Sequence, residues 1–332
     1  MPSVVLIEGI TLQLTRSSDV IVAERVIAIN LLLRLPRPTR PMRIPYVSVL
    51  LTATTLALLP AQAVVVLDST HAQHGYALAE ELAAQPQFAA LFHLDEDGTA
   101  SATWIGNDTH HGYLLTAAHN FCDGSTATSY VYRAVNGSAY RGVSAVSYPI
   151  YRCRPEGKER EDIDGVDLAI VKLDRPVEGL GNAPALYAGS AELGKHLVFG
   201  GYGKRGTGST GESESGNGRP AMATGVIENL IAGKGEDENY FEVALPKEDG
   251  SIENPFEGGK LTRPIDGYAG LIAEGDSGGG AFIKLGGNWV LAGVNSSGDG
   301  DTKYGDASTF LRVSGRADWI AKNAPTARFI GE

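Results

Sequence analysis

Short apolar runs, separated by turns rich in Gly, Asn and Asp, recur from about residue 88 almost to the end of the chain. Many short runs with frequent turn signals predict β-strands that form a sandwich or a barrel. The predicted strands cover 88–94, 102–105, 113–116, 129–133, 167–173, 196–200, 222–230, 240–245, 280–284, 289–294 and 309–313.

Three other segments have different patterns. Residues 74–84 have helical propensity and predict one or two turns before the first strand. Residues 316–323 predict a terminal helix with Trp319 and Ile320 facing inward. Residues 202–220 are poor in apolar residues and rich in Gly and Ser, and strands continue on both sides. This segment is therefore predicted to be a mobile surface loop.

Residues 42–63 have the pattern of a secretory signal peptide. Arg43 precedes an uncharged apolar run over 46–59, and Ala61-Gln62-Ala63 follows it. The run is short for a bilayer span, so no stable membrane span is expected after cleavage. We expect residues 1–41 to be an over-extended reading frame; a long leader or a membrane-interacting arm is the alternative. The expected location is secreted or periplasmic.

Composition narrows the choice of function. The 332 residues are enough for two domains or one large one. A net charge of −11 disfavours a nucleic-acid partner, which requires a basic surface. Two cysteines exclude a disulfide scaffold and a four-cysteine zinc site. The histidine pairs 71/74 and 110/111 have no third ligand at suitable spacing, so no metal site is predicted.

Three separated strings contain residue types that suit nucleophilic catalysis: LTAAH ending at His119, DLAIVKL starting at Asp167, and GDSGG around Ser277. Each has an ordinary structural interpretation when taken alone. A histidine can end a buried strand, an aspartate can form a turn or a cap, and a glycine-rich string can form an anion nest. A neighbouring imidazole can activate a serine hydroxyl, and a carboxylate can orient that imidazole.

In the order His, Asp, Ser, these strings resemble the trypsin/chymotrypsin family of serine proteases over about residues 88–323. The string around Ser277 is also similar to bacterial exported trypsin-like proteins. The resemblance implies an all-β fold of two antiparallel six-stranded β-barrels with a C-terminal helix. The barrels would span 88–190 and 191–332, preceded by an N-terminal segment over 64–87.

The resemblance also assigns roles to individual residues. Ser277 is the expected nucleophile and His119 the general base. Asp167 is the expected orienting carboxylate, with Asp162 and Asp164 as competitors. The backbone N–H groups of Gly275 and Ser277 are the expected oxyanion hole. We therefore expect a serine endopeptidase acting on proteins or peptides without a cofactor; a silent binding protein or an esterase is the alternative, and the oligomeric state is unknown.

Substrate-binding residues follow from the same resemblance. Ser296, Ser297 and Gly298 are expected to pair with the substrate main chain, and Ser296 also to bond Asp167. Leu271 and Ile272 are expected in the specificity pocket, where Leu271 replaces the aspartate of trypsin-like members. Cleavage after Lys or Arg is therefore disfavoured. Leu271 as a core residue, and a pocket made acidic by Asp299, Asp301 and Asp306, are alternatives.

Two further pairings are implied. Asp276 is expected to point inward, with either the amino group of Val64 or an internal Arg, Lys or His as its partner. Cys122 lies three residues after His119, near the family's cysteine that tethers the histidine loop, and Cys153 is its only candidate partner. The expected disulfide fits an exported protein.

Overall fold

The computed structural model describes residues 4–7, 10–13, 63–95, 99–122, 124–153, 165–214, 218–232, 238–298 and 300–331. Except for Ala63, the predicted signal peptide lies outside these residues, as do Asp162, Asp164 and Asp299. The chain divides into two compact units, Met1–Leu56 and Ala57–Glu332. In the first, β1 (Val4–Ile7) and β2 (Ile10–Gln13) form an antiparallel pair. Everything below concerns the second.

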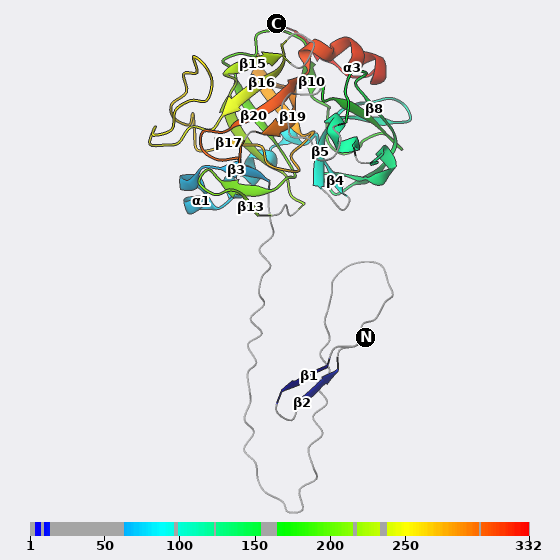
Figure 1. Ribbon diagram of the computed structural model, residues 1–332. Coiled ribbons are helices and arrows are strands. Elements are labelled where there is room, and N and C mark those ends of the chain that lie inside the picture. The colour runs from blue at the N-terminus through cyan, green and yellow to red at the C-terminus, as the bar shows by residue number, and fades with distance from the viewer. Residues whose placement is uncertain are drawn as a thin grey trace, which may run out of the picture. The chain divides into compact units, whose positions relative to one another are not determined.

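A closed six-stranded antiparallel barrel, with strand order β4-β5-β6-β9-β8-β7, forms the first half of this unit (Figure 1). Its interior is a cluster of buried apolar side chains that includes Phe92, Leu114, Tyr132 and Val171. The strands are β4 (Leu91–Asp95), β5 (Thr99–Asn107), β6 (Gly112–Thr116), β7 (Val131–Ala134), β8 (Ala139–Ser147) and β9 (Ala169–Leu173).

A half-barrel forms the second half, with antiparallel neighbours in the order β14-β11-β18-β19-β20-β16-β15. Phe310 packs between Phe199 and Phe241 in its core, at ring-centroid distances of 4.9 and 5.3 Å. β10 pairs in parallel with β19 on one side and with β21 on the other. The strands are β10 (Ala185–Tyr187), β11 (His196–Gly201), β14 (Ala221–Val226), β15 (Asn229–Ala232), β16 (Glu238–Ala244), β18 (Gly280–Leu285), β19 (Asn288–Gly298), β20 (Ala307–Arg312) and β21 (Phe329–Ile330).

The predicted all-β fold with a C-terminal helix is confirmed. The helix α3 (Ala317–Asn323) buries Ile320 completely and sets the ring of Trp319 5.2 Å from that of Tyr148. Short 3-10 turns complete the connections: η1 (Pro86–Phe88), η2 (Ala118–Phe121), η3 (Ala127–Ser129) and η4 (Ser314–Arg316). No helix in the described part of the chain is long and apolar enough to cross a membrane.

A small sheet, which the apolar pattern does not predict, joins the N-terminal segment to the second half. β3 (Val64–Val66) lies between β12 (Arg205–Thr207), which is parallel to it, and the antiparallel β17 (Gly270–Leu271). β12 also pairs with β13 (Gly211–Glu214). The prediction of a loop over 202–220 is therefore wrong for these strands. β13 pairs with the nearby β12, but the backbone groups of β12 also find partners on β3, far away in the sequence, which local composition cannot indicate.

Two short helices follow β3: α1 (Asp68–His74) and α2 (Ala77–Ala83). They begin earlier than the predicted helical segment and break at Gly75, whose φ is +59°. Glycine adopts this conformation at little steric cost, so it ends the first helix.

Candidate active site

His119 and Asp167 meet because their strands are neighbours in the first barrel. β6 runs antiparallel to β9, with Thr116 opposite Ala169. His119 lies just beyond the end of β6 and Asp167 just before the start of β9, so both side chains lie at one edge of the barrel. Asp167 Oδ2 is 2.7 Å from His119 Nδ1, and Oδ1 accepts the backbone N–H of His119 at 2.9 Å.

Asp167 is buried, with 8% of its side chain exposed, whereas 34% of the His119 side chain is exposed. The hydroxyl of Ser296 donates to Asp167 Oδ2 at 2.7 Å, which is the hydrogen bond expected from the sequence. Burial by itself would raise the pKa of Asp167, but the charge of His119 and the hydrogen bonds outweigh it and lower the pKa below its usual value. The carboxylate is therefore ionised at neutral pH.

Tyr240 holds the backbone at Asp167, a contact that the sequence did not reveal. This tyrosine lies on β16 in the second half and is completely buried. Its hydroxyl donates to the carbonyl of Gly165 at 2.8 Å and accepts the N–H of Asp167 at 3.0 Å. The two bonds fix the turn that leads into Asp167.

Ser277 lies in the loop between β17 and β18, close to the histidine segment. Its carbonyl accepts the backbone N–H of Ser101 at 2.9 Å and the side-chain amide of Asn120 at 3.1 Å. Asn120 directly follows His119, so this amide joins the second and first halves at the catalytic motifs. A Cβ at Gly278 would lie 2.0 Å from Thr116 Oγ1 and 2.2 Å from the carbonyl oxygen of Ser101. The close approach therefore requires glycine.

The backbone beside Ser277 suits an oxyanion hole. Gly275 has φ +93°, a conformation that favours glycine. The carbonyl of Glu274 accepts the N–H of Lys204 at 2.7 Å, and that of Gly275 accepts the hydroxyl of Ser101 at 2.9 Å. Within the described residues, neither Gly275 nor Ser277 donates its own N–H to a backbone acceptor. Both N–H groups are therefore available to an oxyanion.

Asp276 points inward, as expected, and is completely buried. It accepts the N–H groups of Gly203 and Ala273, each at 2.9 Å. Burial raises the pKa of Asp276 to about 7, against the opposing effects of these two bonds and of the Arg205 charge. Arg205 is thus a nearby internal cation, and Val64 is opposite Arg205 in the β3–β12 pairing. Arg205 also forms an ion pair with Glu80 at 3.3 Å, and the amino group of Val64 as a partner of Asp276 stays a prediction.

The expected pocket residues separate into two groups. Leu271 is fully buried in a cluster with Val65, Leu67 and Leu245, which corresponds to the core alternative. Ile272 is also buried, and its N–H bonds to the hydroxyl of Ser308 at 3.0 Å.

Ser297 and Gly298 instead lie at the more exposed end of β19. In the adjoining loop, Asp301 pairs with Lys303 and is largely exposed. Asp306 accepts the Lys303 N–H. These contacts give a solvated turn.

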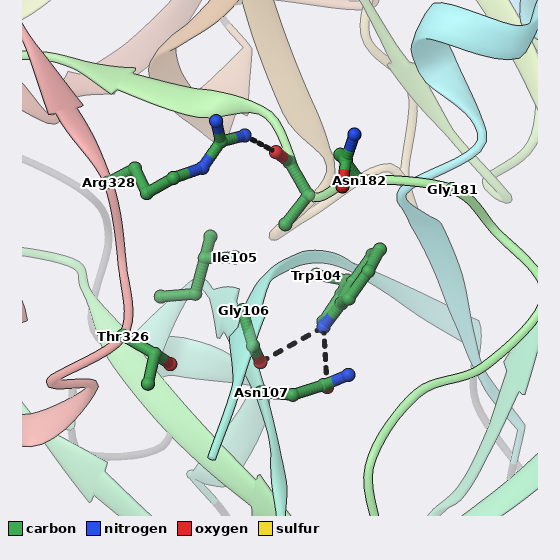
Figure 2. Close-up of a pocket in the computed structure, with 9 residues that line it drawn as sticks. Trp104, Ile105, Gly106, Asn107, Gly181, Asn182, Thr326 and Arg328 are labelled. Carbon is green, nitrogen blue, oxygen red and sulfur yellow. Dashed lines mark hydrogen bonds between the residues drawn. The ribbon is translucent and has the colours of Figure 1, made fainter.

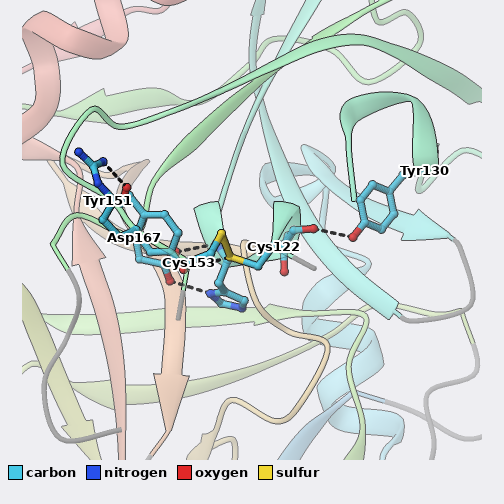
Figure 3. The surroundings of a disulfide bond; sticks show 8 residues. Cys122, Tyr130, Tyr151, Cys153 and Asp167 are labelled. Atoms are coloured by element: carbon cyan, nitrogen blue, oxygen red, sulfur yellow. Dashed lines mark hydrogen bonds and ion pairs between the residues drawn. A yellow bond between two sulfur atoms is a disulfide. The ribbon is translucent and has the colours of Figure 1, made fainter. Parts of the chain in front are cut away.

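The predicted disulfide between Cys122 and Cys153 is present, with a Cα–Cα distance of 5.5 Å (Figure 3). It ties the segment after His119 to the segment after β8. Tyr151 Oη lies 3.7 Å from Cys122 Sγ, and Tyr130 donates to the carbonyl of Asn120 at 2.6 Å. The bridge therefore closes a small cluster beside the His119–Asp167 pair.

A separate pocket of about 260 Å³ lies where the end of β5 meets the C-terminal segment (Figure 2). Arg328 donates to the carbonyl of Ala183, and the Trp104 indole donates to Gly106 O and Asn107 Oδ1. None of the three catalytic candidates lines it. Across the described ranges, no group of three or more His, Cys, Asp or Glu could hold a metal ion.

The site thus combines an ionised, buried carboxylate, an imidazole that it orients, and a serine in a glycine-rich turn. Only residue chemistry and geometry identify it: no protein-family model matches the chain, and no curated protein matches it either.

Proposed function

We propose that this chain is an exported serine endopeptidase of the trypsin/chymotrypsin type, which hydrolyses peptide bonds through an acyl-enzyme. One observation carries the proposal. His119 Nδ1 lies 2.7 Å from the buried carboxylate of Asp167, and the carbonyl of Ser277 is bonded to the residue that follows His119. The fold, mostly β with a closed barrel and a half-barrel, supports the same assignment.

In the proposed mechanism, Asp167 keeps the proton of the imidazole on Nδ1, so that Nε2 can accept the proton of Ser277. The serine oxygen attacks the scissile carbonyl, and the N–H groups of Gly275 and Ser277 stabilise the oxyanion. Each such donor typically contributes about 3 kcal/mol. His119 then protonates the leaving amine, and water hydrolyses the acyl-enzyme by the same steps. No cofactor is required.

Substrate preference is proposed from the pocket and the sheet edge. Leu271 is a core residue at the position where trypsin-like members carry an aspartate, so this position supplies no counter-ion to a substrate Lys or Arg, whose unpaired burial would cost several kcal/mol. A small or apolar side chain before the cleaved bond is therefore preferred. The end of β19 at Ser297 and Gly298 offers backbone groups to an extended peptide. The expected partner is a protein or peptide, in a secreted or periplasmic location.

Two other functions would use the same site. A silent binding protein of this fold would not need an ionised Asp167 bonded to His119, so the geometry favours an enzyme. An esterase would use the same nucleophile. An esterase differs from a peptidase only because it does not cleave amide bonds, so assays with ester and peptide substrates distinguish the two functions.

The test is to treat the purified protein with a fluorophosphonate and to locate the adduct by peptide mass spectrometry. We expect label on Ser277 alone, and none in Ser277→Ala. Hydrolysis of a peptide library should fall by about 10⁴–10⁶ in that variant. A folded protein that takes no label would be the silent binding protein. Labelling with hydrolysis of esters but not of peptides would make it an esterase.

A further inference from the structure

Ser101 holds the nucleophile loop from the opposite half of the molecule. It lies on β5 of the first barrel and is completely buried. Its backbone N–H donates to the carbonyl of Ser277, and its hydroxyl donates to the carbonyl of Gly275, each at 2.9 Å. One residue therefore holds the carbonyls at both ends of the turn that provides the oxyanion donors.

The direction of the hydroxyl is fixed by its other partner. The backbone N–H of Tyr202 donates to Ser101 Oγ at 2.9 Å. A hydroxyl has one hydrogen to donate, and this one is directed to Gly275. The carbonyl of Ser101 in turn accepts the hydroxyl of Thr116 at 2.7 Å. Ser101 is thus anchored on several sides, and its own position is well determined.

The contact matters because Gly275 has no side chain to restrain it. Peptide planes beside a glycine rotate more freely than beside any other residue. A trans peptide is planar, so holding a carbonyl also sets the direction of the N–H in the same plane. Lys204 holds the plane before Gly275 and Ser101 holds the plane after it. The N–H of Asp276 lies in this second plane and donates to the carbonyl of Ala273 at 3.0 Å, so loss of the hydroxyl removes one of the plane's two restraints.

We propose that Ser101 is a positioning residue for the oxyanion hole, a role that rests on the proposed serine peptidase function. Ser101 holds the peptide plane between the two planes that carry the N–H groups of Gly275 and Ser277, and in this way it keeps both groups directed at the site where negative charge develops. This charge exists only in the transition state, so losing the hydroxyl should slow the chemical step without weakening binding. The imidazole would be unaffected, because Ser101 hydrogen-bonds to neither His119 nor Asp167 within the described contacts.

The same strand offers a matched control. Thr103 lies two residues further along β5, faces the same side and is also completely buried. Its hydroxyl is without a hydrogen-bond partner among the residues that the structure describes. Thr103→Val removes that hydroxyl and keeps the shape, so it reports the effect of altering this strand without affecting the loop.

The experiment measures inactivation by diisopropyl fluorophosphate in wild type, Ser101→Ala and Thr103→Val, at a temperature below every unfolding transition. Removing an oxyanion donor outright costs about 10²–10³ in rate, and misplacing one should cost less. We expect the limiting inactivation rate to fall about 10- to 100-fold in Ser101→Ala. The half-saturating concentration and the pH midpoint of inactivation should not move. Thr103→Val should match wild type.

The following outcomes would contradict the proposed role of Ser101. Equal limiting rates in Ser101→Ala and wild type, or a change only in half-saturation or in the pH midpoint, would overturn the proposal. If Ser101→Ala fails to fold, Ser101→Cys keeps an atom at the γ position with a weak donor, and its limiting rate must still fall. A wild-type protein that takes no label at Ser277 would refute the peptidase assignment itself.

Discussion

The two halves of the site are held in different ways. In the first barrel, His119 and Asp167 contact each other through two hydrogen bonds, and both come from neighbouring strands of one barrel. In the second half, Ser277 lies in a glycine-rich turn whose carbonyls are held by Ser101 and Asn120 of the first barrel. The proposed acid–base pair is therefore built within its own barrel, whereas the proposed nucleophile turn is held by both halves.

This difference indicates which substitutions should reduce activity most. The second half does contribute Ser296 and Tyr240 to Asp167, but these bonds reinforce a pair that already exists. The serine turn has glycines with positive φ at 275 and 278; its own half fixes it at Asp276, and the first barrel holds the carbonyls on either side of Asp276. We therefore expect changes inside the pair to abolish the base, and changes at the contact between the halves to reduce the rate in smaller steps.

The largest effect is expected from Asp167→Asn, which should lower kcat about 10⁴-fold, as in other triads of this type. An amide favours the wrong imidazole tautomer, so the base is lost while the fold remains. Asp174→Asn is the matched control, because Asp174 lies just past the far end of β9 and is bonded to Arg141 and Arg175. Peptide hydrolysis with initial-rate kinetics measures both. If the two variants had equal rates, Asp167 would have no role in the reaction.

The pH dependence should show an acid limb from His119, in a range where the buried Asp276, with a pKa of about 7, also titrates. Activity should fall about tenfold per pH unit on the acid side of neutrality, as His119 becomes protonated and can no longer act as a base. The pKa of Asp167 lies below its usual value, so this carboxylate stays ionised and adds no second step in that range. The measurement is kcat/KM from pH 4.5 to 9. A flat profile down to pH 4.5 would be incompatible with a histidine base.

Tyr240→Phe should lower kcat about 10- to 30-fold, because it removes both buried hydrogen bonds of the hydroxyl, and the loss of each costs roughly 1 kcal/mol. The variant frees the backbone at Gly165 and Asp167, so the acid limb of the pH profile should also move, which distinguishes it from Ser101→Ala. Tyr187→Phe is the control, since Tyr187 is equally buried and bonds only the N–H of Ala191 among its described contacts. Equal kcat and pH midpoint in both variants would show that Tyr240 has only a packing role.

The smallest effect on rate is expected from Cys122→Ser combined with Cys153→Ser. The bridge links residues 31 apart, and the loop-entropy model gives about 3–4 kcal/mol of stability. Denaturant unfolding should detect that loss, whereas kcat should change less than in Tyr240→Phe, because the histidine is held by Asp167. A larger drop in kcat would mean that the disulfide, too, positions His119.

Much of the site could be predicted because its chemistry is local in the sequence. Each of the three strings couples a strand to a catalytic residue type, and the strands β6 and β9 were predicted near their observed places. The disulfide was expected because Cys122 resembles the family's cysteine that tethers the histidine loop, and Cys153 is its only candidate partner. Ser101, Asn120 and Tyr240 could not be found in this way. Their bonds span 174, 157 and 73 residues, and no local pattern marks the hydroxyl or amide involved.

The sequence by itself determined the residue types at the site, their order along the chain and an all-β fold, because strand periodicity and turn residues act over a few positions. Only the tertiary structure decided that residues 205–207 and 211–214 form strands, that Leu271 lies in the core and that Ser101 holds the nucleophile turn. The physical reason is that backbone groups and buried hydroxyls must find hydrogen-bond partners wherever the packed chain brings them. That choice is made when the two halves pack together.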